Sequence, residues 1–149
     1  MAGLYVHIPF CKTRCLYCDF FSTTQFERID GYVDKLSEEI HLRKNSAQQA
    51  IQTIYIGGGT PSLLQPTHIE RILQSIGTEN MREITMEINP GDATKTYLQA
   101  IYQVGIQRLS IGIQSFQDNL LKTIGRRHNA QQAIQTDRKS TRLNSSHCR

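Results

Sequence analysis

The chain has 149 residues and a formal net charge of +4, with 38% hydrophobic and 20% charged residues. This size and composition suit one soluble globular domain and are too small for two large ones. No apolar run approaches the roughly 20 residues that span a bilayer. The amino-terminal sequence MAGLYVHIPFC lacks the basic and long apolar regions of a secretory signal, so we expect a cytoplasmic protein.

The excess positive charge lies almost entirely at the carboxyl end. Residues 137–149 contain four basic residues and one acid, so they carry +3 of the +4 and residues 1–136 are nearly neutral. The nearly neutral body has no basic stripe with interleaved aromatic residues, which argues against nucleic-acid binding. The last segment, DRKSTRLNSSHCR, has a single large apolar residue. We expect residues 137–149 to be a non-native or disordered tail and Cys148 to have no role.

Strand-like and helix-like patterns alternate along residues 1–136. Short β-branched apolar runs predict strands at residues 4–8, 53–57, 84–88 and 108–113. Apolar residues at helical spacing predict four helices and the start of a fifth. The first follows Asp30 as its N-cap, the second runs from Pro66 to Gly77, the third ends at Gly105, the fourth covers residues 120–124, and the fifth begins near Asn129. This alternation predicts an α/β fold with a parallel sheet, either open or closed into a barrel.

Residues that could bind a ligand or take part in catalysis follow each predicted strand. The cysteines come after the first strand, Gly57-Gly58-Gly59-Thr60 after the second, Glu87 and Asn89 end the third, and Gln114 follows the fourth. Active sites of open α/β sheets and of (β/α) barrels both lie at the carboxyl ends of the strands. We therefore expect these residues to meet in one site.

Cys11, Cys15 and Cys18 form the pattern C-x-x-x-C-x-x-C, which is the strongest motif of the chain. Three clustered cysteines without a secretory signal favour metal ligation over disulfides. Three thiolates can hold a [4Fe–4S] cluster and leave one iron free to chelate S-adenosylmethionine (SAM), whose sulfonium the cluster then reduces and cleaves. Zinc or unliganded thiols remain the alternatives. For zinc, the candidate fourth ligands are His7, Asp19 and His128.

The glycine run and Glu87 are weaker signals. Three glycines let a ligand approach the backbone closely, although a tight turn alone would also require them. Glu87 alternates with Ile84, Met86 and Ile88, so it faces away from their apolar side chains. In a barrel that direction is the lumen, where a carboxylate needs a cationic partner such as the ammonium of a ligand. On a half-exposed strand it would be a surface carboxylate.

Polar residues beyond the fourth strand are weaker still. An arginine at position 126 or 127 can bind a carboxylate through its planar fork. A solvated helix end explains Arg126-Arg127-His128 equally well. We expect His128 to be a surface histidine.

Four runs in this order, YVHIPFCKTRCLYCDF, IYIGGGTPS, EINPG and RLSIGIQSF, carry a family resemblance. Together they resemble the radical SAM family that contains the oxygen-independent coproporphyrinogen III oxidases (dehydrogenases) and the HemW-type heme chaperones. The resemblance covers about residues 4–135 and implies a TIM-like radical SAM barrel. Members of this family are well over twice this length, and their barrels have six βα units where this chain has four. The resemblance therefore implies that the chain is an inactive amino-terminal fragment with an unpaired sheet edge.

The resemblance also implies a role for particular residues. The three clustered cysteines match the ligands of the [4Fe–4S] cluster. The matching SAM contacts are Tyr5, Gly58, Gly59, Thr60, Glu87, Gln114 and Arg126.

Phe20 distinguishes two branches of this family. The decarboxylating oxidases carry a further cysteine two residues after the third cluster cysteine, where this chain has Phe20, and a long segment before the first strand, where Leu4 follows almost directly on Met1. Both features resemble the HemW branch, which implies binding of heme and its delivery to respiratory apoproteins. Radical oxidative decarboxylation of coproporphyrinogen is the alternative, and a zinc-binding structural module is a remote one.

Overall fold

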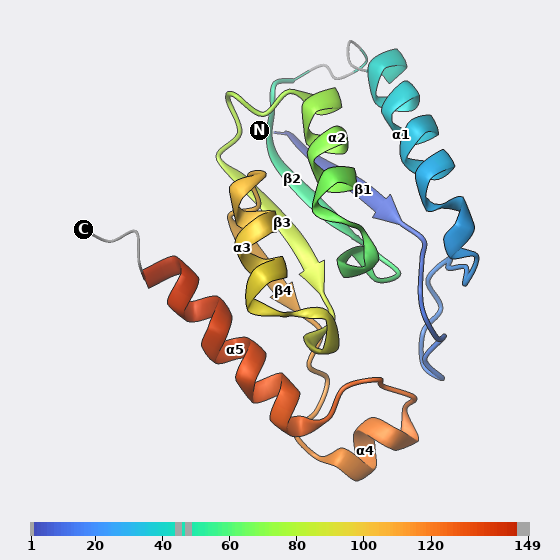
Figure 1. The fold of residues 1–149 in the computed structure, drawn as a ribbon. Helices are drawn as coiled ribbons and strands as arrows, with labels where there is room; N and C mark the ends of the chain where they lie inside the picture. The colour runs from blue at the N-terminus through green and yellow to red at the C-terminus, as the bar shows by residue number, and fades with distance from the viewer. Residues whose placement is uncertain (1, 44–45, 47–48, 146–149) are drawn as a thin grey trace.

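The computed structural model describes residues 2–43, 46 and 49–145, in which four strands form one parallel sheet. The strands are β1 (Ala2–Ile8), β2 (Ile51–Gly58), β3 (Glu83–Ile88) and β4 (Arg108–Ile111), and they pair in sequence order. The connecting helices α1 (Ile29–Arg43), α2 (Pro66–Ile76) and α3 (Lys95–Gln103) all cover the same face (Figure 1). Parallel strands that pair in sequence order, with all helices on one face of the sheet, are typical of a (β/α) barrel, whereas an open doubly wound sheet carries helices on both faces. The α/β prediction is confirmed, and the barrel alternative is the one adopted.

Helix α2 shows why the sequence forms these elements where it does. Pro66 occupies the first turn, where its missing N–H is not needed. The Gln65 side chain accepts from the backbone N–H of His68, and the His68 side chain accepts from that of Gln65. Gly77 ends the helix with a φ of 79°, a conformation that other residues rarely adopt. These are the limits that the sequence predicts.

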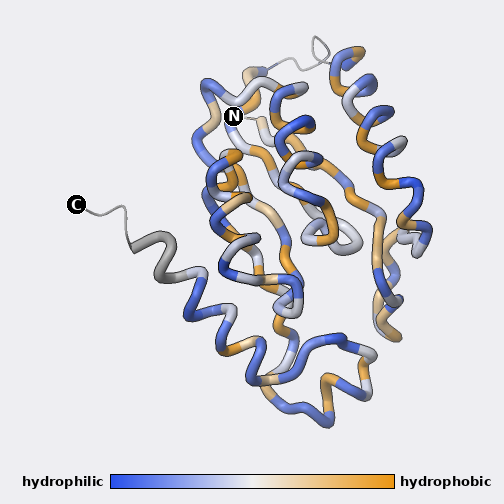
Figure 2. Tube along the Cα trace, viewed as in Figure 1, coloured by the Kyte–Doolittle hydropathy of each residue, from blue (hydrophilic) through white to orange (hydrophobic). Residues whose placement is uncertain are grey.

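The hydrophobic core lies between the sheet and the three covering helices. Alternate residues of each strand point into it, among them Val6, Ile56 and Met86, which are at most 3% exposed. The apolar stripe of α2, which includes Ile69 and Ile72, packs against them. In Figure 2 the hydrophobic colouring of the chain follows this interface. The intervening strand residues therefore face the opposite, uncovered side of the sheet.

Two predicted boundaries are corrected by the structure. Strand β4 ends at Ile111, so residues 112 and 113 begin the loop that follows it. Asp30 is not an N-cap, because α1 begins at Ile29 and Asp30 lies in its first turn. Its carboxylate instead contacts His68 Nε2 at 2.8 Å and links α1 to α2.

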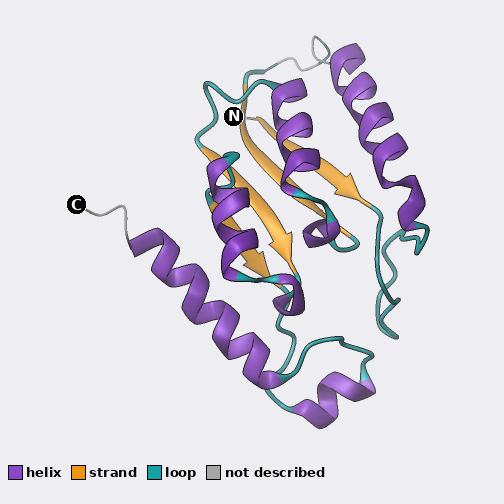
Figure 3. Ribbon diagram, viewed as in Figure 1, coloured by secondary structure: helices purple, strands orange, loops and turns teal. Residues whose placement is uncertain are grey.

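The carboxyl-terminal part is helical up to Ser145, which differs from the disordered alternative for residues 137–149, whereas their non-native origin stays a prediction. Helix α4 (Asp118–Thr123) lies beyond the ends of the strands, and α5 (Ala130–Ser145) then runs back beside α3 (Figures 1 and 3). Residues 137–145 are therefore helical rather than irregular, because no glycine or proline interrupts the helix that starts at Ala130. Cys148 lies outside the described residues. None of the described helices combines the length and the apolar character needed to cross a membrane.

Candidate active site

A cavity of about 400 Å³ opens at the carboxyl ends of the four strands. Its wall is built from loops that follow all four strands, which is the edge where the sequence predicts a site. Nine of the ten expected site residues line it: Cys11, Cys15, Cys18, Gly58, Gly59, Thr60, Glu87, Gln114 and Arg126. Tyr5 is the exception, because its place on β1 opposite Tyr55 sets it back from the loops.

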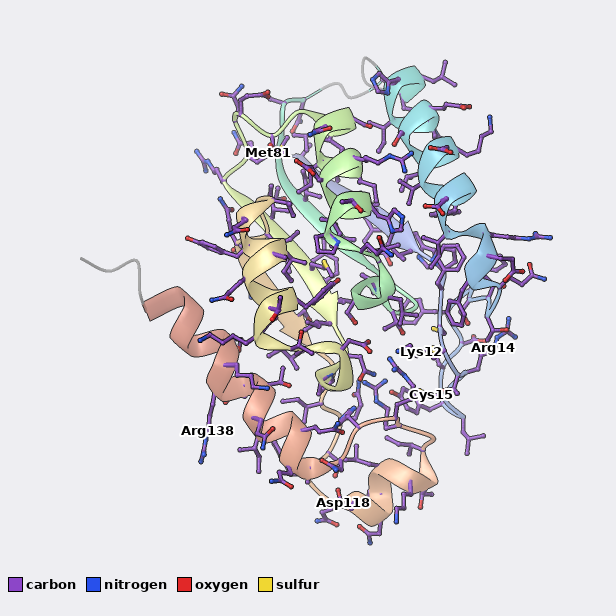
Figure 4. The ribbon with its side chains drawn as sticks, viewed as in Figure 1. Lys12, Arg14, Cys15, Met81, Asp118 and Arg138 are labelled. Atoms are coloured by element: carbon purple, nitrogen blue, oxygen red, sulfur yellow. The ribbon has the colours of Figure 1, made fainter. Side chains whose placement is uncertain are left out.

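The cysteines lie on a long loop that leaves β1 and returns to it. The loop is closed at its base by a bridge between Phe10 and Thr23. The N–H of Cys11 donates to Thr23 O at 2.9 Å, and the N–H of Thr23 donates to Pro9 O at 2.7 Å. Arg14 reaches across the loop and donates to Ser22 O. Figure 4 shows Lys12, Arg14 and Cys15 together on this loop, beside the ends of the strands.

The three thiols have different surroundings. Cys11 is buried, Cys15 is half-buried and Cys18 is exposed. Cys11 Sγ accepts from Thr60 Oγ1 at 3.6 Å, while Cys15 Sγ lies 3.7 Å from Arg126 Nη1. Within the described part of the chain, no three His, Cys, Asp or Glu side chains are gathered as a ready metal site. Three soft thiolate ligands on one loop nevertheless suit an iron–sulfur cluster, because binding of such a group can draw its ligands together.

Two of the three proposed fourth ligands of a zinc site, His7 and His128, make hydrogen bonds to other groups. His7 Nε2 contacts Phe21 O at 3.0 Å, and its Nδ1 contacts Tyr5 Oη at 3.2 Å. His128 is bonded to the loop after β4. The structure therefore offers no support for the zinc alternative through either histidine.

The glycine loop, residues 57–60 at the end of β2, lies against the cysteine loop. Gly58 has a φ of 114°, which favours glycine. A Cβ on Gly59 would lie 2.7 Å from Phe10 O and 3.0 Å from Cys11 Sγ, so only glycine fits there. The N–H of Gly59 also donates to Ile8 O at 2.8 Å. We expected these glycines to let a ligand approach the backbone; in the structure, the close neighbour of Gly59 is the cysteine loop.

Glu87 faces away from the core, as the alternation of β3 predicts. Its carboxylate accepts from Tyr55 Oη at 2.8 Å and from the N–H of Gly58 at 3.1 Å. Tyr5 stacks on Tyr55 with ring centroids 6.1 Å apart. Burial, and then the Glu87 carboxylate, raise the pKa of Tyr5 above its usual value. Among the described residues Glu87 forms no salt bridge, which leaves its charge available to a cationic ligand.

Gln114 and Arg126 complete the far wall. Gln114 has a φ of 66°, and it is the only non-glycine residue in the described ranges with a positive φ. Arg126 Nη2 donates to Gly112 O at 2.5 Å, and Nη1 donates to Tyr17 Oη at 3.4 Å. Its Nε is buried and has no protein partner among the described residues. Arg126 therefore joins the loop after β4 to the cysteine loop.

Sequence reasoning missed a carboxylate that joins four loops of the site. Asp92 accepts from Ser62 Oγ at 2.9 Å and from Arg127 Nη2 at 2.9 Å, and Lys12 Nζ lies 3.6 Å away. The Asp92 side chain is only 10% exposed. Asp92 follows the EINPG run in the sequence, and its partners come from three other segments. The only sequence signal was its place two residues after Pro90, at the carboxyl end of β3.

His128 is not the surface histidine that we expected. Its side chain is 3% exposed, and Nε2 lies 2.9 Å from Ile113 O. Burial lowers its pKa below the usual 6.5, and the nearby Arg126 and Arg127 act in the same direction. The pattern Arg-Arg-His suggested a solvated helix end, but α5 starts only at Ala130 and the three residues turn inward.

Comparison with known proteins identifies the class to which this fold and site belong. The family model of the Radical SAM superfamily matches residues 5–146, and the chain belongs to that family. Membership of this family implies a [4Fe–4S] cluster and SAM.

Individual relatives narrow the assignment. The heme chaperone HemW of Synechocystis is 44% identical over an alignment 135 residues long, which covers 83% of this chain and 32% of that protein. The HemW of Lactococcus lactis is 40% identical, and the zebrafish mitochondrial Radical S-adenosyl methionine domain-containing protein 1 is 37% identical over 95% of this chain. The chain spans about a third of the length of these relatives.

Among solved structures, coproporphyrinogen III oxidase (HemN) from Escherichia coli, a radical SAM enzyme, superposes with a TM-score of 0.82 and 29% identity. The match covers 95% of this chain and 34% of that one. The cobalamin-dependent radical enzyme OxsB shares the fold, with a TM-score of 0.59 and 17% identity. The fold is thus a partial TIM-like radical SAM barrel, as the motifs implied.

Proposed function

We propose that this chain is the cluster- and SAM-binding part of a heme chaperone of the HemW type. The observation that carries the proposal is the single cavity that Cys11, Cys15 and Cys18 share with the glycine loop, Glu87 and Arg126. These groups come from loops far apart in the sequence and converge at the edge where barrel enzymes hold their ligands.

In this proposal the three cysteine thiolates hold the cluster. When bound, the cluster supplies an electron to the sulfonium of SAM. Cys11 is the thiolate with the most fixed surroundings, because Thr60 donates to its sulfur and the Gly59 backbone packs against it. Cys15 is half-buried and Cys18 is exposed, so both thiols are accessible from the cavity side of the loop.

The remaining residues orient SAM. Glu87 offers a carboxylate to the amino group, held in place by Tyr55 and the N–H of Gly58. Arg126 offers its guanidinium to the carboxylate of SAM, and Gln114 its amide to the ribose. Tyr5 does not line the cavity and supports Glu87 indirectly, because it stacks on Tyr55, which donates to the Glu87 carboxylate. Each pairing joins a group of SAM to a side chain of complementary charge or polarity.

Phe20 and the relatives support the chaperone over the oxidase. Phe20 lines the cavity and is 65% exposed. A phenyl ring cannot supply the thiolate that the decarboxylating enzymes carry there. The curated relatives named above include two heme chaperones at 40% identity or more.

The cluster is tested by anaerobic reconstitution with iron and sulfide. We expect about four irons per chain and the broad visible absorption of a thiolate-bound cluster. Replacing Cys11, Cys15 or Cys18 by alanine should reduce the iron content sharply, and Cys148→Ala should not. One tightly bound zinc and no iron would refute the proposal.

The choice of function is tested in the longest reading frame that contains this chain. We expect that protein to bind heme and to form no protoporphyrinogen from coproporphyrinogen under anaerobic reducing conditions with SAM. Repeated loss of propionate carboxyls as carbon dioxide would establish the oxidase instead. Phe20→Cys is the matched variant, since it restores the residue type found in the oxidases without changing the other ligands.

A further inference from the structure

Gln114 occupies a backbone conformation that must be held by its surroundings. A positive φ is unfavourable for a non-glycine residue, and Gln114 has a φ of 66°. This conformation sets its side chain in the wall of the cavity. The carbonyl oxygen of the preceding residue, Ile113, accepts two hydrogen bonds. The N–H of Ser115 donates to that carbonyl at 2.8 Å, and His128 Nε2 contacts it at 2.9 Å.

The state of His128 follows from its partner. A carbonyl oxygen only accepts hydrogen bonds, so Nε2 carries the proton and Nδ1 is a bare lone pair. That Nδ1 is buried and without a partner in the described part of the chain. An unpartnered buried acceptor is destabilising, and an apolar ring would avoid it. Packing alone therefore does not account for an imidazole here, whereas the bond to Ile113 does.

Other contacts already fix the start of α5, so His128 is not needed for that purpose. Arg127 forms two bonds to the buried Asp92 and anchors the same segment. Thr136, one of the buried residues of α5, donates to Pro90 O at 3.1 Å. The bond from His128 is instead directed at Ile113, the residue directly before Gln114.

We propose that His128 is a positioning residue for SAM binding, because its hydrogen bond to Ile113 O keeps Gln114 turned into the cavity. This inference rests on the proposed function, in which the cavity binds SAM. His128 is not among the residues that line the cavity, so it acts through Gln114 rather than by contact with SAM.

The test compares four variants in the reconstituted protein from the longest reading frame that contains this chain. His128→Gln places an amide N–H near the position of Nε2, whereas His128→Asn has the same chemistry but is too short to reach Ile113. His128→Phe keeps the ring and removes the donor. Gln114→Ala removes the side chain that is positioned. The measurements are SAM affinity by equilibrium dialysis, iron content, and thermal unfolding.

We expect His128→Phe, His128→Asn and Gln114→Ala each to weaken SAM binding by about fivefold, the effect of one lost neutral hydrogen bond. His128→Gln should bind nearly as well as the wild type. The double variant of His128→Phe and Gln114→Ala should bind no more weakly than either single one, because both remove the same contact. Iron content should be unchanged in all of them.

Two results would overturn the inference. One is a fully additive double variant, which would mean that the two residues act independently. The other is equal SAM affinity of His128→Asn and His128→Gln, a comparison that holds even if His128→Phe does not fold. Failure of the wild type to bind SAM would instead refute the proposed function, and the two failures are thus distinguishable.

Discussion

Gly59→Ala tests whether the glycine loop packs so closely against the cysteine loop that no side chain can be accommodated at position 59. A Cβ at this position would lie 2.7 Å from Phe10 O and 3.0 Å from both Ile8 O and Cys11 Sγ. Two of these three atoms belong to the backbone of β1 and the loop that follows it, so they cannot move out of the way as the end of a side chain would. The added methyl must push the two loops apart.

The expected size of the effect follows from this crowding. Overfilling a packed site typically destabilises a protein by about 1–3 kcal/mol, and the displaced group here includes the N–H of Gly59 that donates to Ile8 O. With a typical dependence on urea, this corresponds to a midpoint lowered by roughly 1 M. Because Cys11 moves with the loop, we also expect less iron to be retained after reconstitution.

Gly31→Ala is the matched control for the same chemical change. Gly31 lies in α1, and a Cβ there would meet nothing within 4 Å. Alanine should stabilise this helix by about 0.5–1 kcal/mol and leave the iron content unchanged. Urea unfolding of the metal-free chain and iron analysis of the reconstituted protein measure both effects. Wild-type stability and iron content in Gly59→Ala would show that the loops are not in the contact described.

Three further predictions concern charge and protonation. Glu87→Gln should weaken SAM binding by about 1.5–3 kcal/mol, the range for a hydrogen bond to a charged group; unchanged affinity in dialysis would locate the amino group of SAM elsewhere. Asp92→Asn should destabilise the metal-free chain by a similar amount, about 1.5–3 kcal/mol, since Arg127 loses its partner, whereas Glu83→Gln, in an exposed pair, should change urea stability by no more than about 1 kcal/mol. Burial lowers the pKa of His128, so as the pH drops below the usual 6.5 the unfolded chain binds a proton before the folded chain does, and the free energy of unfolding should fall. His128→Gln should remove that part of the pH dependence of thermal unfolding. An identical pH profile in the variant and the wild type would contradict a buried neutral imidazole.

Local patterns were sufficient to predict the order and nature of the elements. The helix from Pro66 to Gly77 could be predicted because its start and end signals act within a few residues. The direction of Glu87 could be predicted because side chains alternate strictly along a strand. The cysteine spacing likewise favoured an iron–sulfur cluster over zinc, because the three thiolates lie close together in the chain.

The fit between loops could not be predicted in the same way. Asp92 has no unusual neighbours in sequence, and its role appears only when Ser62 and Arg127 arrive from other loops. The continuation of α5 past residue 136 was missed because the polar composition of residues 137–145 outweighed the absence of glycine and proline after Ala130.

His128 shows most clearly where the sequence alone was insufficient. Its identity and its place after two arginines suggested a surface position, and that prediction was wrong. Short-range signals determined the strands, the helices, the cysteine motif and the edge of the sheet at which the site would form. Only the tertiary structure decided that Arg126 and His128 would turn inward to hold the loop after β4, because burial and hydrogen-bond partners depend on segments that the chain brings together from far apart.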